Sequence, residues 1–184
     1  LNPSNPSARL PMMNSLITLI DSHTGEPRAV VDGNWVTAIR TAGLSAVAAR
    51  RLARADAQTI AFIGCGVQAT AHLRAFADIF ALREVRAFGR GEANRDAFCE
   101  SGQNIGLSTI AAPSAEDAVR GADIVVTSVT RSPQLEPFLD VNWLAPGSFA
   151  AITDLAGPWL PESMAVFDTL VIDDLRQEAT MKHP

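Results

Sequence analysis

The sequence predicts an α/β fold built around a doubly wound parallel sheet. From residue 59 onward, short apolar stretches alternate with helical patterns, which is typical of parallel βαβ units whose helices cover both faces of a sheet. A glycine-rich turn, Gly64-Cys65-Gly66-Val67-Gln68-Ala69, joins the first of these strands to the first helix. The chain has 184 residues, 47% hydrophobic and 19% charged, which suffices for one substantial core and part of a second domain.

The first part of the chain differs from this alternating part. Two strand-like runs at 16–20 and 28–31 flank the turn formers of 21–27, which predicts a β-hairpin. Apolar residues at three- and four-residue steps then predict a long helix over 38–55, with Thr37 as its N-cap. The alternating part is predicted to have strands at 59–63, 84–88, 107–110, 123–129, 148–152 and 170–173, and helices at 67–80, 92–101 and 114–120.

Charge and composition narrow the classes of partner. The net charge is −5 and the 15 basic residues are scattered, so neither nucleic acid nor a membrane surface is expected as a partner, and a small molecule fits better. The two cysteines, Cys65 and Cys99, lack the spacing of a metal site and are expected to be reduced thiols. The sequence shows neither a signal-peptide pattern nor a run of about 18 apolar residues, which predicts a cytoplasmic protein.

The glycine-rich turn is the strongest functional signal. It follows an apolar strand and opens a helix, the context in which this spacing binds a dinucleotide pyrophosphate. Gly64 permits the tight turn, Gly66 lets the backbone approach the pyrophosphate, and small Ala69 lets helix and sheet pack closely. Backbone N–H groups at Val67 and Gln68 are then expected to face the phosphates. We therefore predict a Rossmann-type site for a nicotinamide cofactor; the alternative is that these glycines only close a turn.

Two further strand ends are predicted to complete this cofactor site. The second strand ends at Phe88-Gly89-Arg90, where sites for NAD usually carry an acidic residue that binds the ribose hydroxyls. Arg90, with Arg95, offers a cation for a 2′-phosphate instead, which favours NADP over NAD; the alternative is that Arg90 is a solvated surface residue. The missing acid also weighs against an S-adenosylmethionine methyltransferase. Residues at the end of the fourth strand are expected to approach the nicotinamide half: Thr127, Ser128 and Val129.

Three stretches of the sequence have a specific order and spacing. They are Asp21-Ser22-His23-Thr24-Gly25-Glu26-Pro27 with the following Val31-Asp32-Gly33, then Thr37-Ala38-Ile39-Arg40-Thr41-Ala42, and then Ile63 with the glycine-rich turn. Together they resemble the ornithine cyclodeaminase/mu-crystallin family, and this order is more specific than any single stretch. The similarity covers nearly the whole chain, although members of the family are considerably longer.

The resemblance implies a two-domain subunit whose Rossmann domain is inserted into a substrate domain that also forms a homodimer interface. Residues 1–36 would belong to the partial substrate/dimerisation domain, 37–57 to a connecting helix, 58–175 to the Rossmann domain and 176–184 to the return. The implied reaction is NAD(P)-dependent hydride transfer at the α-carbon of an amino or cyclic imino acid, as in cyclodeaminases, ketimine reductases and alanine dehydrogenases. The alternative is a protein that holds a cofactor or small ligand without turnover.

The resemblance also marks candidate substrate residues. Arg40 matches the family's arginine for the substrate α-carboxylate, a role that suits a bidentate guanidinium, and Thr41 would support it; the alternative is a surface ion pair. Counted from Pro146-Gly147, the family's cyclodeaminase aspartate falls on Ala156, while this chain has Asp154 two residues earlier, which weighs against cyclodeamination. Asp154 follows a predicted strand and is the candidate catalytic acid/base or amine-binding residue; the alternative is that it caps a following helix.

Overall fold

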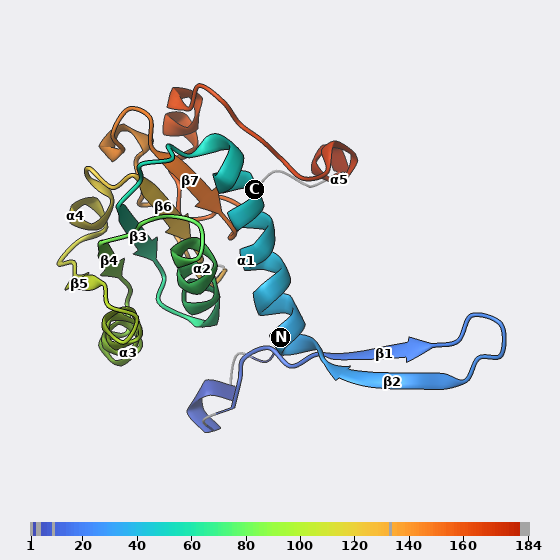
Figure 1. Ribbon diagram of the computed structural model, residues 1–184. Coiled ribbons are helices and arrows are strands. Elements are labelled where there is room, and N and C mark those ends of the chain that lie inside the picture. Colours follow the sequence, from blue (N-terminus) through green and yellow to red (C-terminus); the bar gives the residue numbers. More distant parts are fainter. Residues whose placement is uncertain (1, 3–4, 9, 133, 181–184) are drawn as a thin grey trace.

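The computed structural model describes residues 2, 5–8, 10–132 and 134–180 and shows a parallel sheet covered by helices, with a hairpin projecting from it (Figure 1). The five strands of the sheet lie in the order β5-β4-β3-β6-β7, and all neighbours are parallel. Because the chain passes from β3 outward to β4 and β5, and then returns to β6 on the other side of β3, the strand order reverses between β3 and β6. These strands are β3 (Thr59–Ile63), β4 (Glu84–Phe88), β5 (Ser108–Ala111), β6 (Ile124–Thr127) and β7 (Phe149–Ile152).

Helices cover both faces of this sheet, which confirms the predicted doubly wound α/β class. One face packs against α1 (Gly33–Leu52), α2 (Val67–Ala77) and α3 (Glu92–Gln103). The other packs against α4 (Ala115–Val119) and the segments around the 3₁₀ turns η2 (Val141–Trp143) and η3 (Pro161–Val166). The remaining helices are η1 (Asn5–Ala8) and α5 (Leu175–Thr180).

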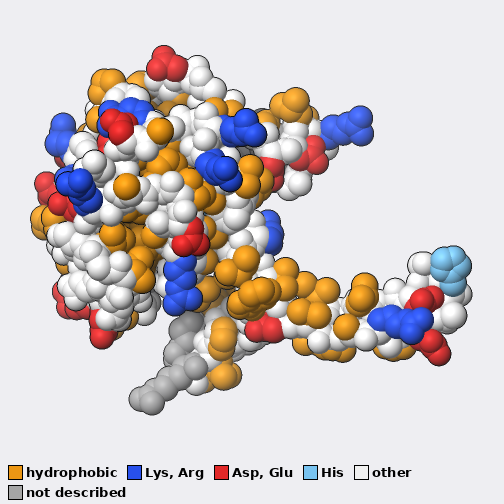
Figure 2. Space-filling model, in the orientation of Figure 1, with side chains coloured by type: hydrophobic (Ala, Val, Ile, Leu, Met, Phe, Trp, Pro, Cys, Tyr) orange, Lys and Arg blue, Asp and Glu red, His pale blue; other side chains and the backbone are white. Residues whose placement is uncertain are grey.

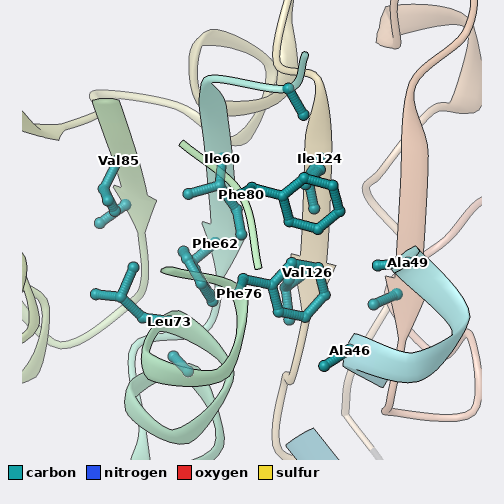
Figure 3. Packing of buried hydrophobic residues seen from close by; sticks show 14 of the residues in the cluster. Ala46, Ala49, Ile60, Phe62, Leu73, Phe76, Phe80, Val85, Ile124 and Val126 are labelled. Carbon is teal, nitrogen blue, oxygen red and sulfur yellow. The ribbon is translucent and has the colours of Figure 1, made fainter. Parts of the chain in front are cut away.

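The alternation of side chains along β3 explains why this strand is central. Ile60 and Phe62 point into the cluster under α1, α2 and α3, as Figure 3 shows, and Ala61 and Ile63 belong to the cluster on the opposite face. All four side chains are buried, as expected of a parallel strand covered on both sides. The sheet is therefore a rigid platform whose strand ends can hold a site.

A two-stranded antiparallel hairpin precedes α1 and extends away from the sheet (Figure 1), as predicted. It consists of β1 (Leu16–Ile20) and β2 (Pro27–Asp32), and most of its apolar side chains are exposed. The side chain of Asp21 holds the turn between the two strands. It accepts hydrogen bonds from the Thr24 and His23 N–H groups and from the Arg28 guanidinium, and these three bonds lower the pKa of Asp21 to about 2. Among the helices that the structure describes, none is long and apolar enough to cross a membrane.

One predicted helix start and one predicted strand are wrong, and several other predicted bounds differ from the structure by one to three residues. Helix α1 begins at Gly33, not at residue 38, because Asp32 is its N-cap and accepts a hydrogen bond from the Asn34 N–H at 2.9 Å. Thr37 therefore lies inside the helix. The run 170–173 is apolar enough for a strand but forms none, since it leaves the sheet beyond β7 and its Leu170 is 68% exposed (Figure 1). A strand needs a neighbour to pair with, and composition cannot show whether one is in reach.

Candidate functional site

The candidate site lies where β3 and β6 end, at the point where the strand order reverses. Gly64 follows β3 with a φ of +92°, and its N–H donates to the Phe88 carbonyl at 2.9 Å. A Cβ at Gly64 would lie only 2.7 Å from the Ser128 carbonyl oxygen. The fold itself therefore requires glycine at this position.

Gly66 is in a different situation. Its φ of −95° and ψ of −164° are open to any residue, and a Cβ added there would meet no atom within 4 Å. It is the N-cap of α2, yet no side chain caps this helix end. The helix N-terminus thus faces open space with N–H groups and a partial positive charge, an arrangement that fits a phosphate group. Ala69, one turn along, is fully buried against the sheet.

The first turn of α2 is tied to α1 through a buried histidine, His72, whose partners in α1 and α2 the sequence did not indicate. The Gln68 carbonyl lies 2.7 Å from His72 Nδ1, and His72 Nε2 lies 3.0 Å from the Ser45 hydroxyl of α1. Because a carbonyl can only accept, Nδ1 donates and Nε2 accepts from Ser45. Burial lowers the pKa of His72, which keeps the ring neutral. In the same turn, Val67 is exposed, and Gln68 Oε1 is buried with no hydrogen-bond partner among the described residues.

Arg90 follows β4 beside the glycine turn. It is exposed and forms no ion pair with the described residues, whereas Arg95 pairs with Asp96 at 3.1 Å. Of the two arginines, Arg90 is thus the one without an ion pair among the described residues. Burial raises the pKa of the Cys65 thiol to about 12, which disfavours the thiolate form.

Asp154 is buried at the ends of β6 and β7 and is 5% exposed. One carboxylate oxygen accepts from the Thr127 hydroxyl at 3.0 Å, and the other accepts from the Val129 N–H at 2.9 Å. Burial raises the pKa of Asp154, although both hydrogen bonds act in the opposite direction. The Val129 N–H is consequently occupied and cannot donate to a ligand. A proton-transfer role for Asp154 stays a prediction.

Arg40 and Thr41 lie in the first half of α1, which begins on the side of the sheet where the strands end (Figure 1). This part of the helix packs on α2 through Ala38 and Ala42, which contact Ala71. Arg40 is exposed, while the Thr41 hydroxyl donates to the Thr37 carbonyl at 2.8 Å. No hydrogen bond or ion pair joins Arg40 to Asp154 in the described part of the chain.

A parallel sheet with a glycine turn and an open helix N-terminus at its switch point is the architecture of Rossmann-type NAD-binding proteins. The chain belongs to the ornithine cyclodeaminase/mu-crystallin family, whose model matches residues 1–157. This confirms the resemblance found in the sequence.

Known relatives agree with this assignment. The ketimine reductase mu-crystallin of Rattus norvegicus is 35% identical over 76% of this chain and 42% of its own. The Thermococcus litoralis Δ1-pyrroline-2-carboxylate reductase in complex with NADH and L-proline superposes with a TM-score of 0.78 at 30% identity, over 84% of this chain and 47% of that one. An archaeal alanine dehydrogenase dimer with bound NAD has a TM-score of 0.71 at 34% identity, over 80% and 45%. This chain spans about half the length of these relatives.

Proposed function

We propose that the full protein is an NAD(P)-dependent oxidoreductase that transfers hydride at the α-carbon of an amino or cyclic imino acid. The proposal rests mainly on the surroundings of Gly66. The fold does not need glycine at this position, and the absence of a side chain leaves space open in front of a helix N-terminus. The similar structures that hold NADH or NAD support the same reading.

Within this proposal, reduction of a preformed imine fits better than cyclodeamination. The family's cyclodeaminase aspartate falls on Ala156, and an alanine side chain can neither accept nor donate a proton. Imine reduction adds one hydride to the carbon of the C=N bond and one proton, taken from water, to its nitrogen. The nicotinamide, when bound, supplies the hydride, and the chain's own residues bind and orient the two reactants.

The residues of this chain divide into a cofactor set and a substrate set. Arg40 holds the substrate carboxylate in the proposed site, and Thr41 supports its helix turn. Arg90 meets a 2′-phosphate, which makes NADP the favoured cofactor. The pyrophosphate is assigned to the glycine turn, with Gly64, Gly66, Val67 and Gln68. The nicotinamide half is assigned to the end of β6, with Thr127, Ser128 and Val129, although the Val129 N–H is already bound to Asp154.

We also propose that the full protein is a cytoplasmic homodimer. The hairpin exposes apolar side chains along its length, as Figure 2 shows, among them Leu16, Leu19 and Val30. An isolated two-stranded ribbon is marginal in water at best, so a covered hairpin is expected in the full protein. Light scattering of the full protein tests this, and a monomer at all concentrations would contradict it.

The test of function is consumption of NADPH or NADH by the full protein with cyclic imino acids such as Δ1-pyrroline-2-carboxylate. Turnover that needs both reactants supports the proposal. Tight cofactor binding without turnover on a broad panel of imino and amino acids supports the second candidate, a binding protein, which Ala156 favours. Binding of neither cofactor by folded protein would refute both.

A further inference from the structure

We propose that Asp154 is a positioning residue, which holds the end of β6 against the glycine turn, and that it does not transfer a proton. The inference rests on the proposed function, because it assigns the residue a role in the same cofactor site.

The directions of the hydrogen bonds around Asp154 follow from the donors. Trp159 Nε1 can only donate, and it lies 3.4 Å from the Thr127 hydroxyl oxygen. The Thr127 hydroxyl therefore accepts from Trp159 and donates its own hydrogen to Asp154. The Val129 N–H donates to the second carboxylate oxygen. Each oxygen thus accepts from one donor of the protein, and the carboxylate is buried together with Thr127 and Trp159.

The segment that Asp154 holds touches the glycine turn directly. The Ser128 N–H donates to the Ile63 carbonyl at 2.9 Å, and the Ser128 carbonyl is the group that a Cβ at Gly64 would strike. Val129 comes next in the chain, and Asp154 fixes its N–H. Loss of this anchor would free the strand end that forms one wall of the turn, so the effect should reach the bound dinucleotide.

The backbone after Asp154 is consistent with such an anchor. Leu155 and Ala156 have φ values of 58° and 56°, a left-handed conformation that is strained for residues other than glycine. Such strain persists where surrounding contacts hold the chain. Hydrogen bonds hold the chain on both sides of Leu155 and Ala156. Asp154 is bound before them, and after them the Trp159 N–H donates to the Ala156 carbonyl at 2.9 Å.

Calorimetric titration of the full protein with NADH, together with steady-state kinetics, tests the proposal with two variants. Asp154→Ala leaves the Val129 N–H without its acceptor, and NADH affinity should fall about tenfold or more. Asp154→Asn keeps one oxygen for that N–H, so NADH affinity and kcat should stay within about threefold and tenfold of wild type, respectively. A proton shuttle would lose roughly 10²–10⁴-fold in kcat in both variants.

Asp123→Ala is the matched control. Asp123 lies at the other end of the central strands, where β3 and β6 begin, and accepts from the Gln58 and Thr59 N–H groups at 2.9 and 3.0 Å. This variant should lower the melting temperature as Asp154→Ala does, yet leave NADH affinity unchanged. If Asp154→Ala does not fold, Thr127→Val is the second variant. It removes the hydrogen bond to the other carboxylate oxygen, through a side chain that is itself fully buried. Asp154 would then be held less firmly, and NADH affinity should fall several-fold.

The outcomes separate the two proposals. Wild-type protein that binds neither NADH nor NADPH refutes the proposed function. Wild-type binding with equal binding by Asp154→Ala overturns the positioning role alone. The positioning role is also overturned if Asp154→Asn loses kcat a hundredfold at unchanged NADH affinity. It is overturned as well if Asp123→Ala weakens NADH binding as much as Asp154→Ala.

Discussion

Replacing Gly66 by serine is expected to weaken cofactor binding strongly without weakening the fold. The position has an extended backbone and an added Cβ would have no neighbouring atom within 4 Å, so the substitution causes no steric clash at the Cβ. Losing a glycine stabilises by about 0.4–1 kcal/mol through the unfolded chain, and serine is at least as good an N-cap. The free energy of unfolding should therefore stay the same or rise by up to about 1 kcal/mol.

The effect of Gly66→Ser on binding should be large. The hydroxymethyl group would fill the approach to the helix N-terminus, and its oxygen would accept the N–H groups that a pyrophosphate needs. We expect NADH and NADPH affinity to fall by about 10- to 100-fold, which corresponds to roughly 1.4–2.8 kcal/mol.

Gly64→Ala is the matched variant in the same turn. Its φ of +92° is strained for alanine, at about 1–3 kcal/mol, and the Cβ would lie 2.7 and 2.9 Å from backbone atoms of Ser128. This variant should lose both stability and binding. Urea unfolding and calorimetric titration measure the two quantities. Wild-type affinity in Gly66→Ser would refute the placement of the pyrophosphate, and wild-type stability in Gly64→Ala would refute the close approach of Ser128.

Three further changes test other parts of the structure. Because burial lowers the pKa of His72 below 6.5, the unfolded chain takes up a proton that the folded chain does not, so stability should decline as the pH falls from 6.5 to the lowered pKa. Urea unfolding at about pH 7 and about pH 5 should show that His72→Gln has a smaller decline; an equal decline would contradict the assignment. Arg90→Ala should weaken NADPH binding about tenfold and spare NADH, as measured by calorimetry, and equal effects on both would exclude a contact with the 2′-phosphate. Phe62→Ala removes a fully buried ring whose centroid lies 4.8 Å from that of Phe98, and it should lower the free energy of unfolding by about 3–5 kcal/mol; a loss under about 1 kcal/mol in urea unfolding would contradict the packing.

The fold class and the place of the cofactor turn could be predicted from the sequence because their signals are local. An apolar strand, two glycines with a small residue at fixed spacing, and a helix follow one another within about twenty residues. The start of α1 was also encoded locally, in Asp32 and Asn34, but the apolar periodicity that begins at Ala38 concealed it. The predicted domain boundaries and site roles stay predictions; residues 181–184 of the predicted return lie outside the described residues.

The surroundings of the buried polar side chains were decided only by the tertiary structure, because they depend on contacts between residues that are distant in the sequence. Asp154 meets Val129 and Thr127 across separations of 25 and 27 residues, and only these contacts show that its carboxylate accepts two hydrogen bonds from the end of β6. His72 reaches Ser45 across 27 residues. Sequence patterns report the neighbours of a residue along the chain, whereas the surroundings that set the ionisation, the hydrogen bonds and the accessibility of a side chain are assembled when the strands pair and the helices pack.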